Sequence, residues 1–243
     1  MYRRLARAWG RQHWWPAETP FEVIVGAILT QNTSWTNVES ALGSLRAAEK
    51  LSVAGIRELP LPRLEKLIRS SGYFRQKASR LKNFVTFLDS HYDGSLERMF
   101  AAPAEELRAA LLTLNGIGPE TADSILLYGG NHAIFVVDAY TRRILQRHEA
   151  VNAKAKYDDI RDLVERALRR QQPFALVPNS SANRSRPKVH PPSAMSSADR
   201  SPLSQVYNEM HGLFVQVGKH YCQKSGPKCE VCPLSPMLKK AIS

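Results

Sequence analysis

The sequence has few cysteines and gathers all of them near one end. Only three occur among 243 residues, at Cys222, Cys229 and Cys232. Small secreted proteins depend on disulfides spread along the chain, so this arrangement does not favour a disulfide framework. Clustered thiols are better suited to holding a metal group, and we expect an intracellular protein.

Long apolar runs and alternating strand patterns are also missing. No segment approaches the roughly 20 apolar residues that cross a membrane. The basic N-terminus is followed by polar and aromatic residues where a signal peptide would have its apolar core. No useful stretch alternates apolar and polar residues as a half-buried strand does. We therefore predict an all-α protein that does not bind a membrane.

Acidic residues are outnumbered by basic ones. The 34 Lys and Arg residues exceed the 22 Asp and Glu residues, which gives a net charge of +12. Such an excess indicates a polyanionic partner, although charge alone also fits an ordinary basic protein. Residues 173–204 supply only four basic residues against one acidic, and hold six of the 15 prolines and eight serines. That composition predicts a disordered insertion.

Helical spacing of apolar residues accounts for much of the remaining chain. We expect a short basic helix within residues 1–20 and a helix that starts at Pro119 and stops at Gly129-Gly130. The other expected helices cover residues 21–30, 36–47, 51–58, 61–70, 76–91, 104–114, 139–147 and 206–221. The first of these is nearly all apolar and has Pro20 in place to start it, so we expect it to be buried.

Two glycines bracket a tight turn between two of these helices. Gly116 and Gly118 leave the backbone bare, and Pro119 suits the first turn of the helix that follows. Free backbone N–H groups at such a helix start can hold a phosphate. The alternative is a plain joint between two helices.

A lone carboxylate follows this turn by twenty residues. Asp138 stands after an apolar run and before a helical pattern, where an ordinary N-cap would also stand. The cap position keeps a carboxylate ionised. A fixed negative charge can stabilise the positive charge that develops when an N-glycosidic bond breaks, and it can orient or deprotonate a water molecule.

The segments LNGIGPETA (114–122) and VVDAYTRR (136–143) resemble the helix–hairpin–helix motif and catalytic aspartate of the endonuclease III superfamily of DNA glycosylases. The spacing Cys222-x6-Cys229-x2-Cys232 resembles the iron–sulfur loop of the same family. The resemblance implies a two-lobed helical fold, with one lobe at 21–135 and the other formed by 1–20 and 136–243. It also implies that double-stranded DNA binds in the cleft with the damaged base flipped out.

The sequence departs from this family at two positions. Bifunctional members carry a nucleophilic lysine eighteen residues before the aspartate, where this chain has Glu120. A carboxylate cannot form a Schiff base, so we predict a monofunctional glycosylase with weak or absent lyase activity. The family's fourth cysteine is replaced by Leu238. A four-iron cluster would then need an outside ligand or a group such as His220, unless the loop binds zinc or nothing.

Within the superfamily, several segments resemble the 3-methyladenine DNA glycosylases of the endonuclease III type. They are Trp14-Trp15-Pro16, Leu29-Thr-Gln-Asn-Thr33 with Trp35, Ser71-Gly72-Tyr73, Gly116-Ile-Gly-x-Glu120 and Gly212 to Lys219. N-alkylated purines carry a positive charge, which an aromatic pocket binds through a cation–π interaction. The resemblance places the following residues at the base pocket: Trp14, Trp15, Trp35 and Lys219. Core packing is the simpler role of each tryptophan, and a phosphate contact or a solvated side chain is the simpler role of the lysine.

The remaining assignments concern DNA contacts and alternative functions. The residues expected to contact DNA are Gln31, Gly72, Lys77, Gly116, Gly118 and Thr121. We expect a monomer that is cytoplasmic and nucleoid-associated if the source is prokaryotic. The alternatives are a glycosylase for oxidised or deaminated pyrimidines or mismatches, and a helix–hairpin–helix DNA-binding protein without catalysis.

Overall fold

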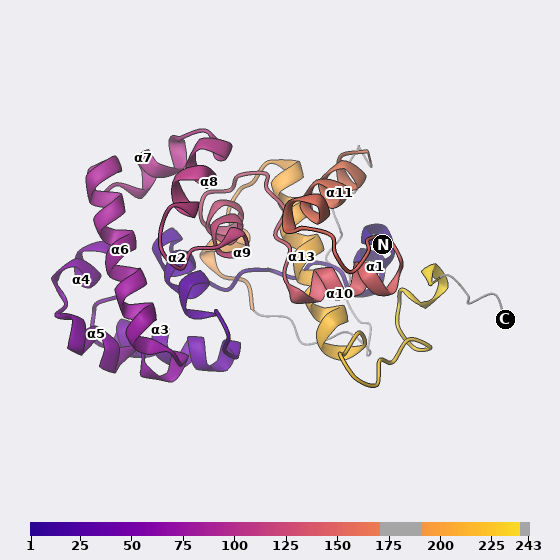
Figure 1. Ribbon diagram of the computed structural model, residues 1–243, viewed down its shortest axis with the longest axis horizontal. Coiled ribbons are helices and arrows are strands. Elements are labelled where there is room, and N and C mark those ends of the chain that lie inside the picture. Colours follow the sequence, from indigo (N-terminus) through magenta and orange to yellow (C-terminus); the bar gives the residue numbers. More distant parts are fainter. Residues whose placement is uncertain (171–190, 239–243) are drawn as a thin grey trace. The chain divides into compact units, whose positions relative to one another are not determined.

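The computed structural model describes residues 1–170 and 191–238, and the all-α prediction is confirmed for them because they contain no strand (Figure 1). Contacts divide the chain into two compact units, which we name the hairpin unit (Ala17–His132) and the carboxylate unit (Met1–Pro16 with Ala133–Ser243). The sequence had placed these divisions at 20/21 and 135/136. Of the helices described, none is long and apolar enough to cross a membrane.

The hairpin unit is built from ten helical segments. They are α2 (Pro20–Leu29), α3 (Trp35–Ala47), α4 (Val53–Glu58), α5 (Leu61–Leu67), η1 (Arg69–Ser71), α6 (Phe74–Tyr92), α7 (Leu96–Ala101), α8 (Ala104–Leu112), α9 (Pro119–Ser124) and one π-helical turn, η2 (Ile125–Gly129).

Helix α2 forms the core of the hairpin unit. Every residue from Phe21 to Leu29 is buried, as its continuous apolar sequence predicts. The helix begins where Thr19 accepts a hydrogen bond from the Glu22 backbone N–H at 3.1 Å, with Pro20 in the first turn. Helices α3, α6 and α9 and the turn η2 all pack against it.

The carboxylate unit has α13 at its centre (Figure 1). Its segments are α1 (Tyr2–Trp9), α10 (Ala139–Arg147), α11 (Tyr157–Arg169), α12 (Ala194–Ser197), α13 (Pro202–His220) and η3 (Ser235–Met237). Helices α1, α10 and α11 pack against α13, which is buried from Ser204 to Gly218. Polar side chains are enclosed with the apolar ones. Glu209 accepts hydrogen bonds from the Gln12 backbone at 2.6 Å and from Gln205 at 3.0 Å.

The predicted insertion at 173–204 needs correction where the structure describes it. Residues 171–190 lie outside the described part of the chain. The remainder holds α12 and the first turn of α13, because its serines and prolines act as helix caps and starts rather than as disorder signals. Ser193 accepts from the Ser196 backbone at 3.2 Å, Met195 is buried, and Pro202 follows the capping Ser201.

Two further helices were not predicted from the sequence. Helix α7 is only six residues long, and its cap is Ser95. Helix α11 has a clear apolar face, with Ile160, Val164 and Leu168 buried at intervals of four residues. Its pattern was therefore readable in the sequence.

Candidate functional site

The helix–turn–helix in the hairpin unit is formed by α8, the turn 113–118 and α9. Gly116 adopts a φ of +83°, and a Cβ atom there would collide with the Arg80 side chain. Gly118 is exposed, has extended backbone and caps α9. Glu120, at the lyase-lysine position, is an exposed residue in the first turn of α9. Only Gly116 is thus required for steric reasons.

A buried ion pair joins the two helices of the hairpin. Arg108 of α8 places Nε 2.6 Å from Oδ1 of Asp123 on α9, and Nη2 3.3 Å from Oδ2. The carboxylate is fully buried and the guanidinium nearly so. This bidentate contact between buried side chains restrains the angle between α8 and α9.

Gln31 lies against the hairpin turn in the same unit. Its amide nitrogen donates to the Gly116 carbonyl and to the Thr121 hydroxyl, both at 2.9 Å. Its amide oxygen accepts from Arg80. Thr121 is buried, and Gln31 is half-buried. The structure therefore brings together three of the residues expected at DNA, Gln31, Gly116 and Thr121, through contacts within the unit.

The loop before α6 contains Gly72, and Lys77 lies in the first turn of α6. Gly72 has a φ of +66°, and Tyr73 beside it is 67% exposed. The Lys77 ammonium is buried and donates to the carbonyls of Leu29 at 2.8 Å and Ser71 at 2.6 Å. Burial, and secondly the charge of Arg80, lower the pKa of Lys77 to about 8. Because the Lys77 ammonium is buried and bonded to these two carbonyls, we do not retain Lys77 among the proposed DNA contacts.

Asp138 in the carboxylate unit is the N-cap of α10. Its Oδ1 accepts from the Thr141 backbone N–H at 2.7 Å, as the sequence predicted for a cap. Burial raises the pKa of this carboxyl, but His211 and Thr141 outweigh it and hold the pKa below its ordinary value. The group is therefore ionised at neutral pH and only 11% of its side chain is exposed.

His211 contacts Asp138, and the sequence analysis did not single it out. It lies on α13 with Nε2 3.4 Å from Asp138 Oδ2. Its ring packs edge-to-face with Trp14, 5.7 Å between centroids, and with Phe135 at 6.4 Å. The apolar pattern of α13 hid it, because a histidine inside a buried helix looks like core until its partner is known.

The other aromatic and basic candidates lie in different settings. Trp14 is half-buried, whereas Trp15 is 5% exposed and packs edge-to-face on it at 6.1 Å. Trp15 therefore belongs to the core. Trp35 belongs to the hairpin unit, is half-buried and donates to Glu39 at 2.9 Å. Lys219 is exposed in the last turn of α13.

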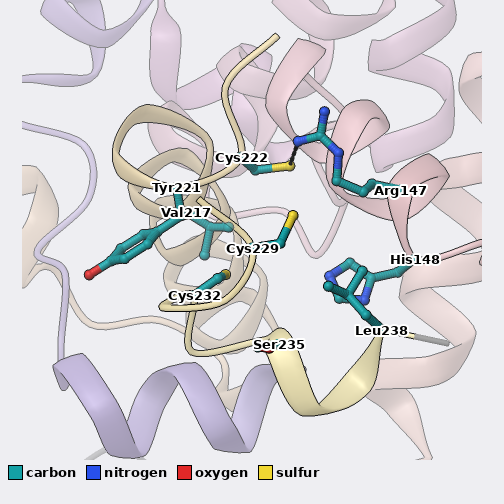
Figure 2. A pocket seen from close by; sticks show the side chains of 9 residues that line it. All are labelled: Arg147, His148, Val217, Tyr221, Cys222, Cys229, Cys232, Ser235 and Leu238. Atoms are coloured by element: carbon teal, nitrogen blue, oxygen red, sulfur yellow. Dashed lines mark hydrogen bonds between the residues drawn. The ribbon is translucent and has the colours of Figure 1, made fainter. Parts of the chain in front are cut away.

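The three cysteines line one cavity at the end of α13 (Figure 2). Its empty space is about 250 Å³, part of it open to solvent. In the described part of the chain, no three His, Cys, Asp or Glu residues are close enough to hold a single metal ion. Within the described residues, the three sulfur atoms are therefore not placed as ligands of one metal ion.

Two of the cysteine sulfurs accept hydrogen bonds. Arg147 Nη1 donates to Cys222 Sγ at 3.0 Å, and the Leu234 backbone N–H points at Cys232 Sγ at 3.4 Å. Burial, with the neighbouring Cys222 and Cys229, raises the pKa of the Cys232 thiol. A cationic iron–sulfur core would offset the repulsion among three thiolates, so the donor set fits the four-iron cluster implied by the cysteine spacing.

The family's fourth ligand position is also at this cavity. Leu238 lines it and has no group that can bind iron. His220, suggested from the sequence as a substitute, is exposed and is not among the lining residues. The histidine that lines the cavity is His148, which the sequence analysis did not consider.

This chain is similar to known DNA repair proteins in sequence. Residues 25–170 match the family model described as "HhH-GPD superfamily base excision DNA repair protein". A Methanocaldococcus jannaschii protein, MJ1434, whose name gives it provisionally as a DNA repair glycosylase, is 40% identical over 236 residues. That alignment covers 96% of this chain and 92% of the relative. Endonuclease III of Thermotoga maritima is 26% identical over 95% of this chain and 86% of its own length.

Solved structures show the same fold. The 3-methyladenine DNA glycosylase (MagIII) of H. pylori, bound to 1,N6-ethenoadenine, superposes with a TM-score of 0.68 and 26% identity, covering 88% of this chain and 91% of that one. An endonuclease III–DNA covalent intermediate gives a TM-score of 0.69 at 19% identity, over 96% and 90% of the two chains.

The all-helical fold, the hairpin turn and the ionised carboxylate define a helix–hairpin–helix protein that acts on DNA. The chain belongs to the HhH-GPD superfamily and is a DNA glycosylase of base excision repair.

Proposed function

We propose that this glycosylase is monofunctional and hydrolyses the N-glycosidic bond of an alkylated purine, such as 3-methyladenine, in double-stranded DNA. The observation that carries the proposal is the ionised Asp138 carboxylate, fixed by Thr141 and His211. The enzyme would act as a monomer in the cytoplasm, with one active site per chain.

Asp138 would act on the sugar and on water. As the glycosidic bond breaks, positive charge develops on the deoxyribose, and a nearby fixed carboxylate stabilises it. The same carboxylate would orient the attacking water and accept its proton. Because the Thr141 N–H and His211 already fix the group, little reorganisation is needed as the charge appears.

The substrate class is supported by one aromatic residue and one relative. Trp14 packs on His211, which in turn contacts Asp138, so a half-exposed indole lies close to the catalytic carboxylate. An indole face favours a cationic alkylated base over a neutral one. The 3-methyladenine glycosylase of H. pylori, whose structure holds ethenoadenine, resembles this chain over 88% of its length. Trp35 and Lys219 remain proposed residues of the base pocket. Trp15 is no longer proposed there, because its side chain is buried in the core.

The lack of lyase activity is proposed from Glu120. This exposed position in the first turn of α9 has a carboxylate where a lyase has its lysine. Without that amine no Schiff base forms with the sugar, and water is left as the nucleophile.

The proposed DNA contacts are main-chain and small-residue groups of the hairpin unit. Gly116 and Gly118 would present backbone N–H groups to a phosphate. Gln31 would hold this turn in place, because its amide nitrogen bonds to the Gly116 carbonyl and to the Thr121 hydroxyl. Gly72 would contact the strand at the exposed loop that also carries Tyr73.

We also propose that the cavity at the end of α13 holds a four-iron cluster on Cys222, Cys229 and Cys232. Such a cluster, when bound, cross-links the loop that follows α13 and is redox-active. The chain's own residues hold it: the three sulfurs as ligands and Arg147 as a hydrogen-bond donor to Cys222.

A single-turnover assay across damaged bases tests the function. Purified protein is incubated with duplexes that contain N-methylated purines, thymine glycol, uracil or a mismatch, and released bases are separated by chromatography. Release of methylated purines, lost by about 100-fold or more in Asp138→Asn, is expected. Asparagine still caps α10, so the variant should fold.

Other outcomes point to the alternatives. Excision of thymine glycol or uracil without methylated purines would make the chain a pyrimidine-directed glycosylase, as its similarity to endonuclease III suggests. DNA binding without release of any base, equal in both proteins, would make it a non-catalytic helix–hairpin–helix protein.

A further inference from the structure

The cavity at the end of α13 is lined by three cysteines, one fewer than a four-iron cluster normally uses. The chain has three cysteines, and all three already line the cavity. A four-iron cluster binds one protein ligand at each iron, so one iron is left to another side chain or to solvent. The other described lining residues are Arg147, His148, Val217, Tyr221, Ser235 and Leu238.

His148 is the best donor in this set. Imidazole nitrogen is an established ligand of iron, whereas the guanidinium of Arg147 has no lone pair to offer and the apolar side chains have no donor atom. Ser235 and Tyr221 have hydroxyl groups, which bind metal well only after they lose the proton. His148, Cys229 and Leu238 line the same cavity (Figure 2).

The hydrogen bond of His148 prepares it for this role. Nδ1 lies 3.3 Å from the Met237 carbonyl oxygen. A carbonyl oxygen can only accept, so Nδ1 carries the proton and Nε2 keeps its lone pair. Histidines that bind metals commonly donate their other ring N–H to a backbone carbonyl in this way. Met237 also directly precedes Leu238, so the bond fixes His148 at the place of the family's fourth cysteine.

His148 is held rigidly from both directions along the chain. It is the C-cap of α10, and its backbone N–H bonds to the Ile144 carbonyl at 3.0 Å. The preceding residue, Arg147, donates to Cys222 Sγ and to the Gln223 carbonyl. Helix α10 therefore meets the cysteine loop with two consecutive side chains: Arg147 donates a hydrogen bond to sulfur, and His148 lines the cavity.

We infer that Nε2 of His148 is the fourth protein ligand of the cluster, in place of the cysteine that the family has at the position of Leu238. The inference rests on the cluster proposed above. A neutral imidazole in place of a thiolate makes the cluster less negative, so its reduction potential should lie above that of the all-cysteine variant His148→Cys.

The experiment uses the full chain, reconstituted anaerobically with iron and sulfide and compared as wild type, His148→Ala, His148→Cys and two controls. The controls are His220→Ala, which changes an exposed histidine at the end of α13, and Ser235→Ala, which changes another polar lining residue. The readouts are iron and sulfide per chain, loss of the visible band under a chelator, and nitrogen hyperfine coupling to the paramagnetic cluster with and without ¹⁵N-histidine.

The expected result is a cluster in wild type with coupling to one histidine nitrogen. His148→Ala should lose that coupling and bleach about tenfold faster or more, whereas both controls should match wild type. His148→Cys should keep the cluster, lose the coupling and show a lower potential. A cluster whose content and spectrum are unchanged in His148→Ala would overturn the ligand assignment alone. Wild type that binds no iron, or a single zinc ion, would overturn the cluster as well.

Discussion

His211 Nε2 lies 3.4 Å from Asp138 Oδ2 and joins the central helix α13 to the N-terminus of α10. The carboxylate is therefore fixed twice, by its own helix through Thr141 and by a neighbouring helix through an imidazole. Because His211 also supports the Trp14 ring, one side chain positions both the proposed catalytic group and the proposed base-stacking surface.

The first prediction concerns His211→Gln. With His211 gone, burial of Asp138 is opposed mainly by Thr141, so the pKa of the carboxyl should rise. Activity needs the ionised form, and the acidic limb of kcat/KM against pH should move to higher pH. Base release at neutral pH should fall about tenfold, as expected for the loss of about 1.4 kcal/mol.

The control for this prediction is His220→Gln on the same helix, where the histidine is exposed. It should leave both the rate and the pH profile unchanged. A uniform loss of rate in His211→Gln without movement of the acidic limb would show that His211 is merely structural.

The lowered pKa of Asp138 also predicts how the free energy of unfolding depends on pH. The stabilisation that the ionised carboxylate contributes is present above the ordinary Asp pKa and is lost as pH falls through the folded value.

A second prediction concerns the lyase position. Wild type should form no covalent complex with damaged DNA when borohydride is added, because Glu120 cannot form a Schiff base. Glu120→Lys places an amine at this exposed position in the first turn of α9 and should give a trapped complex, seen as a shifted band on a denaturing gel. Glu105→Lys, in the first turn of α8, adds the same charge and should give none. Trapping by wild type would contradict the monofunctional assignment.

A third prediction separates the two glycines of the hairpin. Gly116→Ala forces an alanine into left-handed backbone and against Arg80, so it should lower the free energy of unfolding by about 1–3 kcal/mol or more. Gly118→Ala has no atom within 4 Å of the new methyl and should fold like wild type. Chemical denaturation measures both. If Gly118→Ala keeps its stability but binds duplex DNA more weakly, the backbone at that position contacts the phosphate as proposed.

A fourth prediction concerns the ion pair of the hairpin. Arg108→Met removes the guanidinium that pairs with the buried Asp123 carboxylate and should destabilise the protein by about 3–5 kcal/mol. Arg98→Ala breaks the exposed pair with Asp93 and should cost about 0–1 kcal/mol. Equal effects of the two variants in urea denaturation would mean that the hairpin does not depend on the buried pair.

Local signals allowed most of the fold to be predicted from the sequence. Residues 139–147 were expected as a helix capped by Asp138, and α10 has these bounds and this cap. Caps and apolar periodicity are encoded within a few residues, so they can be read directly. Local signals were also misinterpreted. Ser193 and Pro202 lie at the starts of helices, but the sequence analysis interpreted them as signs of disorder.

Long-range partners could not be predicted in this way. His211 meets Asp138 across 73 residues of sequence, and His148 meets Met237 across 89. Lys77 was expected to contact DNA, but its ammonium bonds instead to carbonyls of α2 and of η1. Such contacts depend on how helices pack, which no local pattern records.

The inward placement of Lys77 and Arg80 affects how the protein should respond to salt. Both cations are counted in the net charge of +12, yet Lys77 bonds to carbonyls and Arg80 fills the space beside Gly116 and bonds to Gln31. Neither is then available to displace the counterions that surround a phosphate. DNA affinity should therefore fall with rising salt more gently than the formal charge suggests, because main-chain N–H groups release no condensed cations.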